Sequence, residues 1–67
     1  MANYWHIRLL VGDGAAAVGL SADSASAAIA GAREFVRQPD AYVLAVLCHG
    51  LMPPAQPHFV GSLEAAQ

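Results

Sequence analysis

Apolar residues alternate with small or polar residues along two neighbouring stretches near the start of the chain, residues 4–11 and 15–22. Alternation of this kind is typical of β-strands with one buried face. Between the two stretches stands Asp13-Gly14, a dipeptide that favours a two-residue type I′ turn between antiparallel strands. The pattern therefore predicts a β-hairpin over residues 4–22.

A turn at Asp13-Gly14 fixes which residues of the two strands lie opposite each other, and opposite residues share a face of the sheet. The predicted pairs of the first face are Val11 with Ala16, Leu9 with Val18, Ile7 with Leu20 and Trp5 with Ala22. The pairs of the second face are Leu10 with Ala17, Arg8 with Gly19 and His6 with Ser21. The first face is wholly apolar and the second is mixed, so the first is expected to face the core.

Residues 21–36, SADSASAAIAGAREFV, have apolar positions spaced for one face of a helix. Asp23 or Ser24 is suited to cap its N-terminus. Pro39 is expected to end it, because proline disfavours helical geometry in the preceding residue and donates no backbone hydrogen bond. The many alanines and Gly31 predict close packing of this helix against a sheet.

A third strand is predicted over residues 41–49, AYVLAVLCH, whose apolar residues on both sides are typical of a strand covered on both faces. A right-handed crossover through the helix would lay it beside the first strand. The predicted fold class is α+β: a ββαβ unit with an antiparallel sheet of order 2-1-3 and one helix packed on one face. Tyr42, Leu44, Val46 and Cys48 would then face the helix.

The C-terminal part is rich in proline, and the chain is expected to divide into a ββαβ domain, residues 1–50, and a tail, residues 51–67, partly packed on it. The prolines between residues 53 and 57 force an extended loop. Residues 58–60 could form a short fourth edge strand, and Leu63 could add an apolar contact. The tail could instead cover the open sheet face or become ordered only on a partner.

Composition points to a chain that buries surface against another molecule. Hydrophobic residues make up 57% of its 67 residues and charged residues 12%, about half the usual charged share of roughly 25%. Disorder is disfavoured, and a protein partner, a nucleoprotein complex or a second copy is expected to cover apolar surface. Direct nucleic-acid binding is disfavoured, because there is no lysine and the net charge is -2.

A cytoplasmic location in a bacterial host cell is expected. The first residues lack the basic start and apolar core of a signal peptide. The longest apolar run, residues 41–48, is far shorter than the roughly 20 residues needed to cross a bilayer. A membrane partner is therefore not expected.

Candidate chemistry centres on Cys48, the only cysteine, beside His49. Neighbours in a strand point to opposite faces, so the two cannot share a proton or a metal, and Cys48 is expected to be a buried structural residue. His6 and His49 lie toward the same end of the mixed face, where only His58 could supply a third metal ligand. That site stays an alternative; no metal, no cofactor and no catalytic residue are expected, because serines lack a nearby base and acidic residues are scattered.

The sheet face away from the helix is the candidate partner-binding surface. It is flat, apolar in the middle and edged by aromatic and arginine groups of the kind enriched at interfaces. The candidate partner-binding residues are Tyr4, His6, Arg8, Leu10, Val43, Leu47 and His49. The alternative occupant of this face is a second copy of the chain.

The element SADSASAAIAGAREF, residues 21–35, runs from a strand into a short alanine-rich helix. It resembles the corresponding element of small phage anti-CRISPR proteins, and it is also similar to the helix entry of HicB-type antitoxins. The first resemblance implies a small non-enzymatic inhibitor or modulator that occupies a surface of a larger complex. The second implies an antitoxin-like regulator, and the alternative function is therefore a structural homodimer or a HicB-like antitoxin or regulator.

Overall fold

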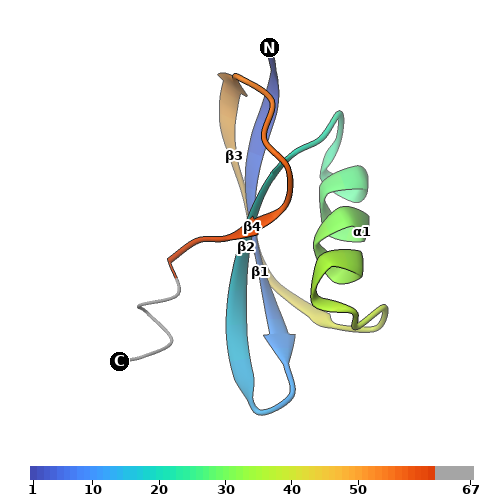
Figure 1. Cartoon of the computed structure of the whole chain (residues 1–67). Coiled ribbons are helices and arrows are strands. Elements are labelled where there is room, and N and C mark those ends of the chain that lie inside the picture. Colours follow the sequence, from blue (N-terminus) through green and yellow to red (C-terminus); the bar gives the residue numbers. More distant parts are fainter. Residues whose placement is uncertain (62–67) are drawn as a thin grey trace.

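A computed structural model of the chain describes residues 1–61, and Figure 1 shows their arrangement. The fold is α+β, with an antiparallel four-stranded sheet and one helix in these residues. Its elements are β1 (Ala2–Val11), β2 (Gly14–Ser21), α1 (Ala25–Val36), β3 (Tyr42–Met52) and β4 (His58–Phe59). Residues 62–67 of the expected tail, including the expected contact of Leu63, lie outside the described residues. No helix within residues 1–61 is long and apolar enough to cross a membrane.

The strand order is β3-β1-β2-β4 rather than the three-strand order 2-1-3, because β4 adds to the outer side of β2. The expected fourth strand over residues 58–60 is only partly formed, since β4 comprises two residues. Val60, the residue after β4, still lies alongside β2, because its amide donates to the carbonyl oxygen of Ala17 at 2.8 Å. The tail thus runs along one edge of the sheet.

The hairpin turn lies one residue earlier than expected, at Gly12-Asp13, so that Val11 pairs with Gly14. A type I′ turn needs a positive φ at both central residues. Here Gly12 has φ 61 and Asp13 has no positive φ, a pattern typical of a type II′ turn with glycine first. The register shifts by two residues, which leaves each side chain on its predicted face.

Helix α1 begins and ends at identifiable caps. Ser24 is the N-cap, and its Oγ accepts from the Ala27 amide at 3.1 Å. Arg37 closes the C-terminus in the left-handed conformation at φ 61, before Pro39. Gly31 allows close contact with the sheet, since a Cβ there would lie 2.7 Å from Leu20 Cδ1. The expected close packing of this helix is therefore present.

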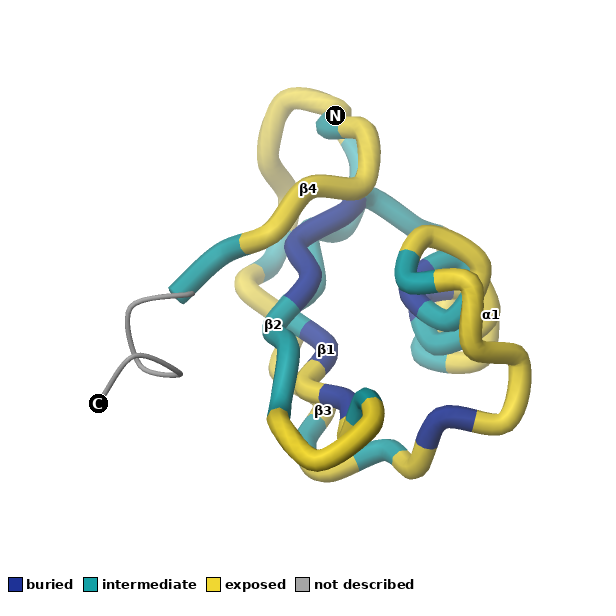
Figure 2. Tube along the Cα trace, turned by 60° about the horizontal axis from the view of Figure 1, so that its bottom comes forward, coloured by how far each residue is buried: buried dark blue, intermediate teal, exposed yellow. Residues whose placement is uncertain are grey.

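The core lies between α1 and the helix-facing side of β1 and β2. Figure 2 shows buried positions on β1, on β2 and on the side of α1 nearest the sheet. The buried hydrophobic residues of the described chain are Ile7, Leu9, Val18, Leu20, Ala28, Ala32 and Ala41. Trp5 closes one end of this core, where its Nε1 donates to the carbonyl oxygen of Ala22 at 3.0 Å.

Strand β3 departs from the expected facing of its side chains because it contains a β-bulge. Arg8 pairs with Ala45 but Leu9 pairs with Val43, so Leu44 is an extra residue on β3. The predicted facing of its first two residues, Tyr42 toward the helix and Val43 on the opposite face, is therefore wrong. Val43 packs against the core, and Tyr42 lies opposite Leu10 on the other face.

The expectation that both faces of β3 are covered is also wrong. Helix α1 packs mainly over β1 and β2 and touches β3 less. Val46 and Cys48 pair with Ile7 and Trp5 on the helix side, yet Val46 is 37% exposed and Cys48 is exposed rather than buried. A single narrow helix does not reach across to this edge of the sheet.

Replacement of Leu9 by alanine is predicted to remove much of the stability of the fold. Leu9 is fully buried, and such truncations cost about 2–5 kcal/mol, against a total of about 3–10 kcal/mol for a chain of this length. Urea denaturation followed by circular dichroism measures the loss. Leu10→Ala is the matched control, because Leu10 is 45% exposed and its truncation should cost less than about 1 kcal/mol. Equal losses in the two variants would contradict the assigned core.

Candidate functional site

The sheet face opposite α1, here called the open face, carries most of the candidate binding residues. Strand alternation and the pairing of β1 with β2 and β3 place its residues. They are Tyr4, His6, Arg8 and Leu10 of β1, Ala17 and Gly19 of β2, and Tyr42, Ala45, Leu47 and His49 of β3. Of the predicted partner-binding residues, only Val43 lies on the helix side. Tyr42, which was not among them, lies on the open face opposite Leu10.

One end of the open face is a cluster of rings around Tyr4. The ring centroids of Tyr4 and His6 are 5.2 Å apart and those of Tyr4 and His49 are 5.9 Å apart. The His6 and His49 rings are closer still, at 4.1 Å in an edge-on arrangement. The two histidines therefore share one end of the face, as the sequence predicts.

His58 joins this cluster from the tail. Its ring stacks on Tyr4 with an interplanar angle of 17°, and the Tyr4 hydroxyl lies 2.9 Å from His58 Nε2. His58 Nδ1 lies 2.8 Å from the carbonyl oxygen of Gln56, which can only accept, so Nδ1 carries the proton. With the proton on Nδ1, Nε2 can accept from the Tyr4 hydroxyl, so one tautomer satisfies both hydrogen bonds.

Gly19 makes this contact between the tail and β1 possible. A Cβ at Gly19 would collide with the Tyr4 hydroxyl and lie 3.0 Å from His58 Nε2. The position therefore needs glycine for space and not for backbone freedom. The sequence gives no sign of this role, because the three residues are far apart in the chain.

The other end of the open face is apolar and well exposed. Leu10 is 45% exposed, Leu47 52% and Tyr42 67%. Between the two ends lies a small hollow of about 160 Å³, lined by His6, Arg8, Ala17, Leu47, Val60 and Gly61. Small-molecule sites usually occupy about 300–1,000 Å³, so the hollow suits a single inserted side chain better than a substrate.

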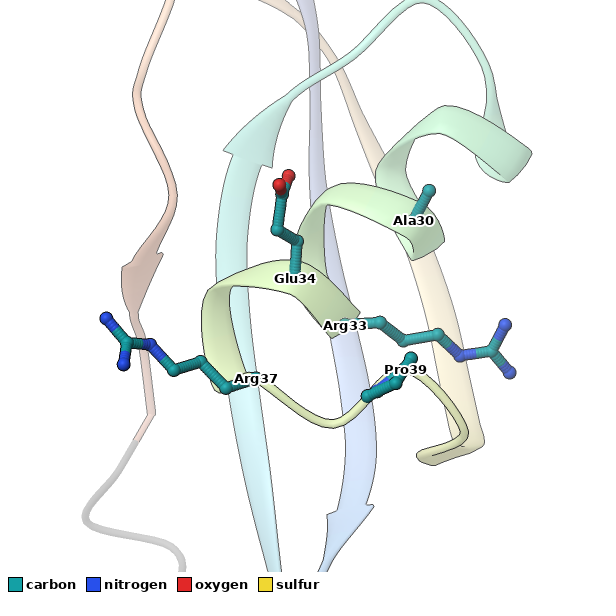
Figure 3. A pocket seen from close by; sticks show the side chains of 5 residues that line it. All are labelled: Ala30, Arg33, Glu34, Arg37 and Pro39. Atoms are coloured by element: carbon teal, nitrogen blue, oxygen red, sulfur yellow. The ribbon is translucent and has the colours of Figure 1, made fainter.

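The helix carries a larger groove, of about 510 Å³, on its outer side. Figure 3 shows that Arg33 and Arg37 point away from each other at this groove, so they do not converge on one anion. Arg33 Nε donates instead to the carbonyl oxygen of Ala41 at 3.0 Å. This guanidinium ties the helix to the loop that leads into β3.

The histidines and the cysteine do not converge on a metal within the described part of the chain. Residues 1–61 contain no group of three or more histidine, cysteine or acidic side chains placed to hold a metal ion. Cys48 lies opposite Trp5 on the helix side, whereas His49 contacts Tyr4 on the open face. The arrangement presents rings, a guanidinium and branched side chains on a flat surface, which suits contact with another protein.

Comparison with known proteins gives no match to this chain: no family model, no curated protein and no solved structure is significantly similar to it.

Substitution of Gly19 by alanine is predicted to release the tail from the sheet. The new methyl group displaces the Tyr4 hydroxyl and breaks its hydrogen bond to His58. The Val60 amide, which donates to Ala17, should then exchange with solvent at least about tenfold faster by NMR, the equivalent of 1.4 kcal/mol. Gly14→Ala is the control, because nothing lies within 4 Å of a Cβ there. Unchanged exchange in Gly19→Ala would show that the Tyr4–His58 contact does not hold the tail.

Proposed function

We propose that this chain is a non-enzymatic protein-interaction module that binds a protein partner through its open face. The observation that carries the proposal is that the open face collects the residue types of interfaces while α1 covers only the opposite side. Tyr4, Arg8 and Tyr42 supply aromatic and guanidinium groups, and Leu10 and Leu47 supply exposed apolar area.

These residues suit a protein partner for a physical reason. Tyrosine and arginine are enriched among the residues that contribute most to binding, because each combines a large contact area with a polar group. Arg8 stands on the central strand β1, opposite Ala17 on one side and Ala45 on the other. Its guanidinium is therefore flanked by small side chains that leave a partner room to reach it.

Binding rather than reaction is proposed because the side chains spread over a flat sheet. General acid–base or nucleophilic catalysis requires groups within hydrogen-bond reach of each other and of a bound substrate. The Tyr4–His58 pair meets the first condition, but both ring nitrogens of His58 are engaged, one by Tyr4 of β1 and one by the carbonyl oxygen of Gln56 within the tail. The hollow beside Leu47, at about 160 Å³, is smaller than the roughly 300–1,000 Å³ of usual small-molecule sites.

Within this class we favour an inhibitor or modulator that occupies a surface of a larger complex. The resemblance of residues 21–35 to phage anti-CRISPR proteins supports this role. The charge also supports it, because Asp13, Asp23 and Asp40 are exposed in the loops of a chain with net charge -2. A nucleoprotein complex has basic surfaces that such loops can approach. The alternative is a structural homodimer or HicB-like regulator with no inhibitory target.

Expression of the chain in bacteria with active CRISPR immunity is predicted to raise the plating efficiency of a targeted phage. Arg8→Glu should abolish the increase, because it reverses the charge at the middle of the open face. Arg37→Glu is the matched control, since it makes the same charge change at the exposed C-terminus of α1.

The same variants serve in a pull-down of the surveillance complex from that host. The chain and Arg37→Glu should retain it, and Arg8→Glu should bind at least about tenfold more weakly. No gain in plating with the unaltered chain would contradict the inhibitory role. Equal behaviour of the two variants would contradict the choice of the open face.

A further inference from the structure

The two edges of the sheet differ in how the described chain protects them. The tail covers the β2 edge, where the Ser21 amide donates to the carbonyl oxygen of Ala55 at 3.0 Å and the Ala55 amide donates to Ser21 Oγ at 2.7 Å. Strand β4 continues along the same edge. At the other edge, no segment within residues 1–61 pairs with the outer side of β3.

Strand β3 also lacks the usual chemical protection of an edge strand. Natural edges are interrupted by charged side chains, by proline, by β-bulges or by very short strands. Strand β3 has 11 residues, YVLAVLCHGLM, with no lysine, arginine, acidic residue or proline among them. Its exposed apolar side chains include Leu44 at 46%, Leu47 at 52% and Leu51 at 65%. Bulges interrupt β3 at Leu44 and beside Gly50, but the segment between them, residues 45–48, is regular and uncharged, and such an edge is a template for pairing with another strand.

We infer that β3 pairs antiparallel with β3 of a second copy of this chain and so forms a symmetric dimer with one continuous sheet. The inference goes beyond the proposed function, because it concerns the edge of the sheet and does not depend on a partner at the open face.

The geometry of the sheet constrains this pairing. An antiparallel pair of identical strands is related by a two-fold axis perpendicular to the sheet, which leaves both helices on the same side. The bulges at Leu44 and beside Gly50 leave a regular segment over residues 45–48. Opposite residues must share a face, so the residue at the axis must lie opposite its own copy. Near the middle of the regular segment, the axis therefore passes between the two copies of Val46 or between the two copies of Leu47. On either axis the exposed helix-side groups of β3 lie beside those of its copy, in the space between the two α1 helices.

A second copy of this chain fits this edge for two reasons. Like charges directly opposite each other destabilise paired strands, and an uncharged β3 opposes none to its own copy. The pairing also closes on itself, since it uses both exposed β3 edges. The outer edges of the dimer are then the two short β4 strands, which do not continue the assembly.

Sedimentation equilibrium of the whole chain tests the inference. The 6.9 kDa chain should have twice that mass at micromolar concentration. Val46→Lys should be monomeric there, with its dissociation constant raised at least about a hundredfold, because it places two ammonium groups close together, either at the axis or next to it. Ala30→Lys adds the same charge on the exposed side of α1 and should remain dimeric.

Hydrogen exchange of the unaltered chain gives a second readout that needs no variant. Amides between residues 45 and 48 that point away from β1 should become protected as the concentration rises. A monomer at every concentration, or a dimer unaffected by Val46→Lys, would overturn the inference. Arg8→Glu should remain dimeric, so its loss of partner binding is distinguishable from loss of the dimer. A dimer broken by Arg8→Glu and retained in Val46→Lys would place self-association on the open face and also overturn it.

Discussion

The packing of α1 on β1 and β2 determines which surfaces of this chain remain uncovered. The helix contributes Ala28 and Ala32 to the core, and Gly31 lets it approach Leu20 closely. Small side chains give close packing but little buried area per residue. One short helix therefore covers the middle of one sheet face, and both the β3 edge and the open face stay exposed.

The tail, as far as residue 61, protects the β2 edge of the sheet. His58 is fixed between Tyr4 and the Gln56 carbonyl, and Phe59 packs on Phe35 with ring centroids 4.9 Å apart. These contacts cover the β2 edge from both faces. Within residues 1–61 the opposite edge is an unpaired strand without charge, and Leu10, Tyr42 and Leu47 of the open face stay exposed.

The sequence predicts the helix and strands of this fold better than it predicts which side chains of each strand face the helix. Alternation along β1 and the cap at Ser24 are local signals that the sequence shows directly. The pairing of β1 with β2 differs from the predicted one by two residues, and a shift by an even number leaves each side chain on the same face, so the core residues of the hairpin were predicted correctly. Strand β3 is apolar on both sides, so its pattern could not indicate the bulge at Leu44, the exposure of Cys48 or the packing of Val43 against the core. The Tyr4–His58 contact joins residues 54 positions apart, and no local pattern encodes it.

The central claim is that the apolar open face is available to a partner, and the exposure of its methyl groups tests this most directly. Relaxation by a soluble paramagnetic agent reports how closely solvent approaches each methyl group in NMR spectra of the dilute chain. We predict strong relaxation at Leu10 and Leu47 and almost none at the fully buried Leu9 and Val18. Relaxation at Leu47 as weak as at Leu9, at the lowest measurable concentration, would mean that the face is already covered and would contradict the claim.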